Sequence, residues 1–171
     1  MPRLLRIFLS SPGDVSEERA LAERVFRRLD NEFAQGARLE LILWEHEPLF
    51  AHSGFQQQIP RPSQCDLVVS VLWARLGTRL PADFAAPAGE SPMTGTEFEI
   101  KDALDAYRRM GRPNLLIYRK TARPQVDLTS ADAGERLLQY RKLQEFCQRE
   151  LREAYSFKLR SIPAVRGWLV S

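Results

Sequence analysis

The segment at residues 65–73, which reads CDLVVSVLW, is the feature that most constrains the fold. Its apolar residues are nearly continuous, rich in valine, and do not alternate with polar ones. A half-exposed strand would alternate, so this pattern predicts a strand that is buried on both of its sides. We therefore place residues 65–73 at the centre of a sheet.

The rest of the sequence alternates between predicted strands and predicted helices. Apolar runs predict further strands at residues 4–9, 39–44 and 114–119, and a last one near residues 157–162. Apolar residues that recur every three or four positions predict helices from Asp14 to Gly36, over residues 96–110 and over residues 137–154. Because parallel neighbours need crossover connections, this order predicts an α/β, three-layer fold around a mostly parallel sheet of four to five strands.

The predicted helices carry cap signals and apolar stripes. Asp14 and Glu17 have the spacing of a capping box, and Gly111 is a C-terminal signal for the second helix. The first helix is predicted to bury the stripe Leu21, Val25, Phe26, Leu29 and Phe33. For the last helix, the predicted buried side consists of Leu138, Tyr140, Leu143, Phe146, Cys147 and Leu151.

The composition predicts one globular domain over residues 1–171. Of the 171 residues, 44% are hydrophobic and 27% are charged, and the formal net charge is +3. The two cysteines form no CxxC or Cys/His cluster, and the apolar run at the start is too short for a signal peptide. We expect a cytoplasmic protein with no membrane partner. Arginines of the second half are interleaved with Glu and Asp, as on a solvated helix face, so nucleic acid is not an expected partner.

Ligands of such a sheet bind at the carboxyl ends of its strands. Three connections leave those ends, at residues 10–14, 45–54 and 73–99. The first reads SSPGD and offers hydroxyls and backbone amides at a helix N-terminus, where a phosphate or carboxylate is favoured. A tight turn followed by a helix cap explains the same residues, and the sequence leaves both interpretations open.

Two glutamates lie at the start of the second predicted helix. Glu97 and Glu99 flank the apolar stripe of that helix, so either carboxylate can reach a cleft beside the core. The alternative is a structural role, since Thr94 with Glu97 and Thr96 with Glu99 both match a capping box.

Other kinds of catalytic site are disfavoured. His46 and His52 lie on a proline-containing loop and lack the helical spacing of a metal site, so no metal and no cofactor is expected. No GxSxG, GxGxxG or GxxxxGK[ST] motif is present, and Cys65 begins a buried strand, where thiols are usually inert.

Three stretches, in this order, resemble one family. Residues 6–11 (RIFLSS) are similar to the opening strand of Toll/interleukin-1 receptor (TIR) domains, particularly those at the N-terminus of bacterial STAND NTPases and related defence proteins. Residues 65–73 resemble the third strand of that family. Residues 97–104 (EFEIKDAL) resemble the helix that carries its glutamate, with Ala103 four positions after Glu99.

The resemblance implies a flavodoxin-like fold and cleavage of the nicotinamide N-glycosidic bond of NAD. The alanine spacing favours Glu99 as the catalytic residue, with Glu97 as the second candidate. Ser10, Ser11 and Gly13 would meet the phosphates or ribose of the substrate. Trp73 and Arg75 would contact the dinucleotide, although core packing explains Trp73 equally well. Gly54 is similar to the glycine of the family's BB loop.

The resemblance also implies a biological setting. It indicates the effector domain of a prokaryotic antiviral or cell-suicide system, active when several copies self-associate. The chain would be the N-terminal module of a longer protein with sensor or NTPase domains. Two alternatives are a non-enzymatic TIR-like assembly module and, third, a nucleoside deoxyribosyltransferase-like enzyme that works through a covalent intermediate.

Overall fold

The computed structural model describes residues 2–43, 60–80, 94–151 and 158–162, and for the last range the backbone alone. The histidines at 46 and 52, Gly54 and the tail after residue 162 lie outside the described residues.

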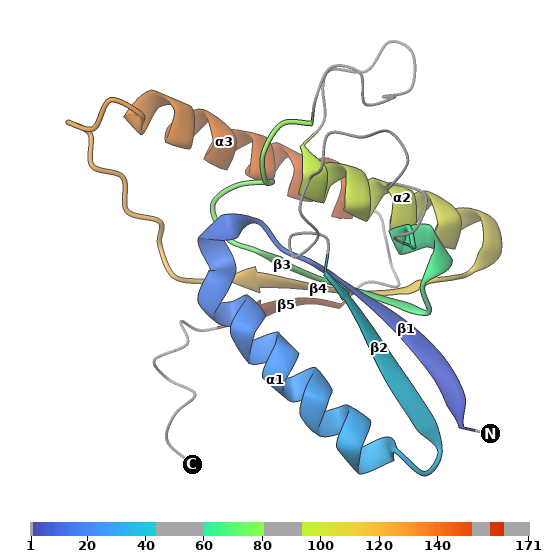
Figure 1. Ribbon diagram of the computed structural model, residues 1–171. Coiled ribbons are helices and arrows are strands. Elements are labelled where there is room, and N and C mark those ends of the chain that lie inside the picture. Colours follow the sequence, from blue (N-terminus) through green and yellow to red (C-terminus); the bar gives the residue numbers. More distant parts are fainter. Residues whose placement is uncertain (1, 44–59, 81–93, 152–157, 163–171) are drawn as a thin grey trace, which may run out of the picture.

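A five-stranded parallel sheet forms the middle of the molecule (Figure 1). Its strands, in the spatial order β2-β1-β3-β4-β5, are β1 (Arg3–Ser10), β2 (Ala37–Leu43), β3 (Leu67–Leu72), β4 (Asn114–Lys120) and β5 (Lys158–Ile162). This strand order is the flavodoxin-like one, and it confirms the predicted α/β fold.

β3 occupies the centre of the sheet, as its sequence predicts. Every residue of β3 after Leu67 is buried. The strand is shorter than the apolar run, however, because Cys65 belongs to the turn that precedes it. The backbone N–H of Cys65 donates to the carbonyl of Pro62, 3.1 Å away, and closes the short helix η3 (Pro62–Gln64).

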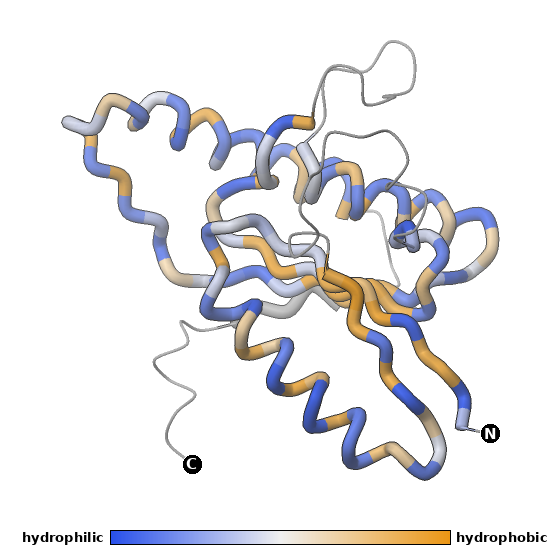
Figure 2. Tube along the Cα trace, in the orientation of Figure 1, coloured by the Kyte–Doolittle hydropathy of each residue, from blue (hydrophilic) through white to orange (hydrophobic). Residues whose placement is uncertain are grey.

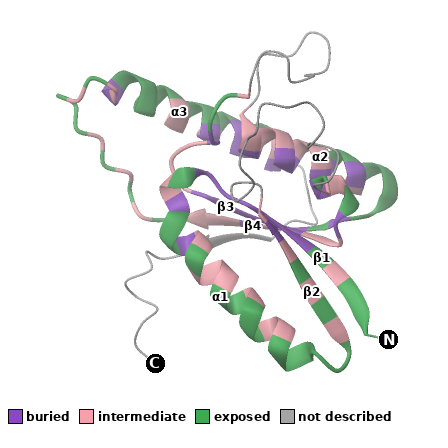
Figure 3. Ribbon diagram, in the orientation of Figure 1, coloured by how far each residue is buried: buried purple, intermediate pink, exposed green. Residues whose placement is uncertain are grey.

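Two helices cover one face of the sheet. These are α2 (Gly95–Met110) and α3 (Ala133–Phe146), which lie on the same side in Figure 1. Their buried side chains, among them Ile100, Leu104 and Leu143, pack with Phe8, Val68, Leu72, Leu115 and Ile117 of the strands. Figure 3 shows buried segments on α2, on α3 and on the central strands, and Figure 2 shows that these strands are largely apolar.

Of the described helices, α1 (Ser16–Phe33) is the one that covers the opposite face. Ala22 and Phe26 pack there against alternating residues of the central strands, which include Ile7, Leu9, Val69 and Val71. The predicted stripe of α1 is only partly buried, because Val25 is 45% and Phe33 57% exposed. Phe33 lies in the last turn of α1.

The ends of α2 agree with the sequence prediction, and α3 begins earlier than predicted. Gly111 follows α2 in the left-handed conformation, with φ of 70°, and its N–H donates to the carbonyl of Tyr107. α3 begins at Ala133 and continues as a π-helical turn, Cys147–Leu151.

Leu138 is a wrong prediction, since it is 49% exposed. The buried residues Leu143, Phe146, Cys147 and Leu151 recur at helical spacing. Leu138 precedes Leu143 by five positions, which is a rotation of roughly 140° around an α-helix. Tyr140, also predicted to be buried, is half-buried.

No helix within the described ranges is long and apolar enough to cross a lipid bilayer.

Two leucines of α3 test the position of the core. Leu143 is fully buried, so Leu143→Ala removes packed methyl groups and is expected to lower the free energy of unfolding by about 2–5 kcal/mol. Leu138→Ala, on the same helix, is the matched control and is expected to change it by less than about 0.5 kcal/mol. Urea unfolding followed by circular dichroism measures both. Equal losses in the two variants would contradict this arrangement of α3.

Candidate functional site

The carboxyl ends of β1 and β3 define the place where this fold binds ligands. From β1 the chain moves to β2 on one side, and later it returns to β3 on the other side of β1. A crevice forms at such a switch point, outside the carboxyl ends of the two strands. The segments that leave these ends are Ser10–Asp14 and Trp73–Arg75, which contain all five predicted substrate-binding residues: Ser10, Ser11, Gly13, Trp73 and Arg75.

Glu99 points from α2 toward the sheet. Its side chain accepts a hydrogen bond from the hydroxyl of Ser10, with 2.5 Å between Ser10 Oγ and Glu99 Oε2. Both residues are buried, since Glu99 is 6% and Ser10 1% exposed. The hydrogen bond therefore joins the first turns of α2 to the last residue of β1 and orients the carboxylate.

Ser70 is a buried polar residue beside this hydrogen bond that the sequence analysis did not single out. It pairs with Ser10 in the register of β1 and β3, and it lies on the same face of the sheet. Among the described residues, no hydrogen-bond partner is found for Ser70 Oγ, although the residue is fully buried. A signal was present, because Ser70 is the only polar residue in LVVSVL.

Glu97 has a different environment from Glu99. Its Oε1 lies 3.5 Å from Nζ of Lys101, and the two side chains are each about one-fifth exposed. Its backbone N–H donates to the hydroxyl of Thr94, which caps α2 as predicted. The structure thus separates the two glutamates, with Glu97 in a partly exposed ion pair and Glu99 in the protein interior.

A cavity of about 810 Å³ opens at the same edge of the sheet. One wall comes from Gly13 and Asp14, and a second from Trp73 to Arg75. The third wall consists of residues 123–126 and the first half of α3 up to Tyr140. Three predicted binding residues, Gly13, Trp73 and Arg75, therefore come together in its lining. Glu99, Ser10 and Ser11 are not among the lining residues.

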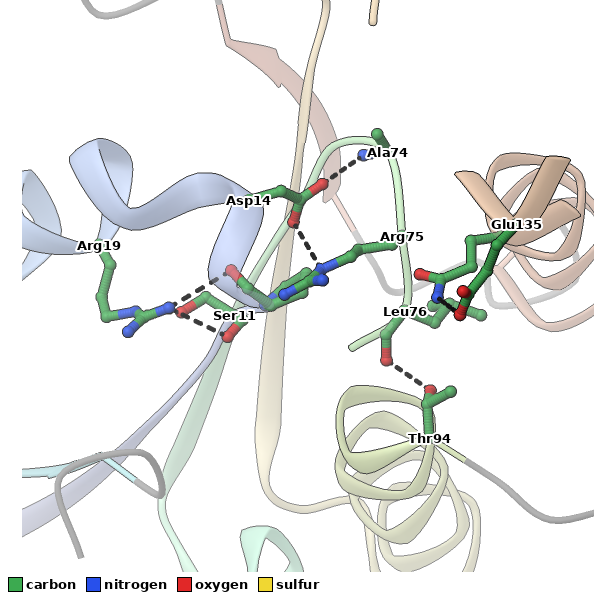
Figure 4. Close-up of polar contacts among 10 residues, drawn as sticks. Ser11, Asp14, Arg19, Ala74, Arg75, Leu76, Thr94 and Glu135 are labelled. Atoms are coloured by element: carbon green, nitrogen blue, oxygen red, sulfur yellow. Dashed lines mark hydrogen bonds and ion pairs between the residues drawn. The ribbon is translucent and has the colours of Figure 1, made fainter. Parts of the chain in front are cut away.

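Ser11 is engaged by the next helix rather than by the cavity. Its hydroxyl accepts a hydrogen bond from Nε of Arg19, at 2.8 Å, and the residue is 7% exposed (Figure 4). Arg19 of α1 thereby holds the turn that follows β1.

Asp14 links the β1 and β3 connections, and its predicted role as a helix cap is wrong. Its Oδ2 accepts the backbone N–H of Ala74 at 2.9 Å, and its Oδ1 lies 3.9 Å from Nε of Arg75 (Figure 4). The short helix η1 (Gly13–Val15) precedes α1, whose N-cap is Val15 without a side-chain cap. Burial raises the pKa of the Asp14 carboxyl, while the N–H of Ala74 and the charge of Arg75 oppose that rise.

The guanidinium of Arg75 lies close to Gly13. A Cβ atom on Gly13 would lie 2.8 Å from Nη2 of Arg75, closer than van der Waals contact permits. The missing side chain therefore lets the guanidinium lie against the turn after β1.

Trp73 is held in place by a buried ion pair that the sequence did not reveal. Its Nε1 donates to the carbonyl of Ala122 at 2.7 Å, and Nζ of Lys120 lies 4.3 Å from its ring centroid. Lys120 Nζ in turn lies 2.6 Å from Oε1 of Glu18, and both side chains are largely buried. No local pattern could predict this pair, because its partners belong to α1 and β4.

The structure supports neither a metal site nor a reactive thiol among the described side chains. No cluster of three or more potential metal ligands occurs in that part of the chain. Burial raises the pKa of the Cys65 thiol to about 11, so at neutral pH the thiol is protonated and a poor nucleophile.

No protein-family model matches this chain, and no curated protein gives a significant match to it.

The buried ion pair predicts a large effect of a single substitution. Lys120→Met leaves the Glu18 carboxylate buried without its cation, which is expected to lower the free energy of unfolding by about 3–5 kcal/mol. In the double variant Glu18→Leu with Lys120→Met, no buried charge is left and most of that loss is expected to be recovered. Chemical unfolding measures both, and a double variant as unstable as the single one would contradict a charge effect.

Asp14 predicts a pH-dependent change in stability. Because the folded-state pKa of Asp14 is raised, its contribution to stability is complete below pH 3.8 and is lost as the pH rises through the folded pKa. Asp14→Asn keeps an acceptor for the Ala74 N–H. It is expected to be at least as stable as the unmodified chain at pH 7, with the difference shrinking as the pH falls.

Asp127→Asn is the control of opposite sign. Hydrogen bonds from Thr129 lower the pKa of Asp127, so that carboxylate stabilises the folded chain above its unfolded pKa. Asp127→Asn is therefore expected to be less stable than the unmodified chain at pH 7. Thermal unfolding between pH 4.5 and pH 7 measures both differences, and an Asp14 variant that behaves like the control would contradict the assignment.

Proposed function

We propose that the chain is a TIR-like NAD glycohydrolase in which Glu99 is the catalytic residue. The observation that carries this proposal is the buried carboxylate of Glu99, oriented by Ser10 at the carboxyl edge of a flavodoxin-like sheet. Glu97 is the weaker candidate, because its carboxylate is paired with Lys101.

The proposed reaction breaks the bond between C1′ of the ribose and the nicotinamide nitrogen. The bonding electron pair leaves with nicotinamide, which becomes neutral, and positive charge develops on the ribose. An ionised carboxylate stabilises that charge in a site from which water is largely excluded. Water then adds to C1′ and loses a proton, which yields ADP-ribose. No metal takes part in this scheme.

The substrate-binding residues divide into two groups in this proposal. Ser10 positions Glu99, while Gly13, Trp73 and Arg75 contact the dinucleotide from the wall of the cavity. Ser11 and Arg19 hold the turn between the two groups. Substrate binding must then extend from the cavity toward Ser10, which precedes Gly13 by three positions.

The biological role in this proposal follows from the TIR resemblance. The domain acts as a cytoplasmic effector of a prokaryotic antiviral or cell-suicide system, and self-association activates it. Sensor or NTPase domains of the same polypeptide are its expected partners.

A second candidate function is a non-enzymatic assembly module. It is favoured by one observation, that Glu99 does not line the described cavity and is engaged by Ser10. In this alternative the hydrogen bond only fastens α2 to β1, and the glutamate has no substrate.

Release of nicotinamide from NAD tests the proposal. Glu99→Gln keeps the shape of the side chain but removes its charge, so the rate is expected to fall by about two to three orders of magnitude. Glu97→Gln is the matched control on the same helix and is expected to keep most of the activity. The rates are measured by chromatography of nicotinamide, at high protein concentration and with forced clustering.

The outcomes separate the candidate functions. Full activity in a folded Glu99→Gln variant would contradict the assignment of Glu99, and loss only in Glu97→Gln would move it to that residue. Absence of nicotinamide release from the unmodified chain under all of these conditions would favour the assembly module. Transfer of a deoxyribosyl group between bases would favour the transferase.

A further inference from the structure

The charged groups around the cavity are unequally engaged. Arg75, Arg123 and Arg136 line it, together with Asp14, Asp132 and Glu135, so its formal charges cancel. The three carboxylates all have partners within the protein. Asp14 faces Ala74 and Arg75, Asp132 accepts from Ser130 and Arg136, and Glu135 accepts from Gln139.

Two of the three arginines keep donors for a ligand. Arg136 is committed to Asp132, with 2.7 Å between Nε and Oδ2. Arg75 approaches Asp14 only through Nε, at 3.9 Å, and its side chain is 39% exposed. Arg123 is exposed, and no ion pair is found for it within the described part of the chain. Arg123 is therefore the cation of the cavity that can pair with an anionic ligand, and the N–H groups that Arg75 does not direct at Asp14 can add to that contact.

The cavity also presents two aromatic side chains. Trp73 comes from the end of β3, and Tyr140 from the middle of α3. The indole is fixed by Ala122 and is covered on one face by Lys120. A flat group can therefore stack only on the other face of Trp73 or on Tyr140.

We infer that this cavity binds a nucleoside diphosphate, with Arg75 and Arg123 on its phosphates and Tyr140 or Trp73 against its base. Arginine binds phosphate through paired N–H groups, and aromatic rings stack on any base. A volume of about 810 Å³ lies within the usual range of small-molecule sites. The identity of this nucleotide rests on the proposed function, according to which it is the ADP part of NAD.

This assignment adds new residues to the site. Neither Arg123 nor Tyr140 lies in the three stretches that resemble TIR domains. Arg123 lies in the connection after β4, and Tyr140 lies on α3. They act as specificity residues, because they touch the part of the ligand remote from the bond that is cleaved.

Binding of ADP to the full chain, measured by isothermal titration calorimetry, tests the inference. ADP contains no nicotinamide bond, so its binding is independent of cleavage. We expect saturable binding that Arg123→Gln weakens by about tenfold or more and Tyr140→Ala by about five- to tenfold. The affinity for inorganic pyrophosphate, which has no base, is expected to fall in Arg123→Gln and to stay unchanged in Tyr140→Ala.

Matched controls are exposed residues that do not line the cavity. Arg112 is exposed and lies before β4, at the amino edge of the sheet, whereas Arg123 follows β4 at the carboxyl edge. Leu138 is an exposed residue of α3 that does not line the cavity. Arg112→Gln and Leu138→Ala are therefore expected to leave the affinity for ADP unchanged.

The inference is overturned by an absence of saturable ADP binding in the millimolar range, or by equal weakening in Arg112→Gln and Arg123→Gln. ADP affinity that neither cavity variant changes would also overturn it. A chain that binds ADP as expected but never releases nicotinamide refutes the proposed function alone. Cleavage of NAD without Arg123-dependent binding of ADP refutes this inference alone.

Discussion

Burial of β3 on both of its faces is the constraint on which the rest of the structure depends. A strand with apolar side chains on both sides requires cover on both sides, and here α2 with α3 supplies one layer and α1 the other. The helices α1, α2 and α3 lie in the connections that follow β1, β3 and β4. All described strands run parallel, so their carboxyl ends meet at one edge. The fold thereby gathers Ser10, Asp14, Trp73 and Lys120 without any motif that joins them in sequence.

Three largely buried carboxylates at this edge have polar partners, which limits the cost of removing them from water, whereas no hydrogen-bond partner is found for Ser70 in the described part of the chain. Glu99 accepts from Ser10, Glu18 contacts Lys120, and Asp14 contacts Ala74. Each pair joins elements that are distant in sequence, so each also fixes the position of one connection relative to another. The site and the tertiary structure therefore depend on the same contacts.

The apolar runs carried enough information to predict the fold, and the site was predictable only in part. Hydrophobic periodicity depends on neighbouring residues, so the strands, the end of α2 at Gly111 and the burial of Leu143 were accessible from sequence. The prediction for Asp14 was wrong because an aspartate at this position fits a capping box and fits a contact to a distant loop equally well, and the structure shows the contact to the loop. Glu18 and Lys120 look like solvated residues until the fold brings them together.

The two halves of α3 have different neighbours. Leu143 and Phe146, in its second half, belong to the core, while Asp132 to Tyr140 border the cavity. The first turns expose most of their side chains and contribute little to the core, so they can fray while the second half stays packed. Fraying of these turns would open one wall of the cavity at low energetic cost. Any molecule that binds there would suppress such local opening and so protect the amide hydrogens of these turns from exchange with solvent.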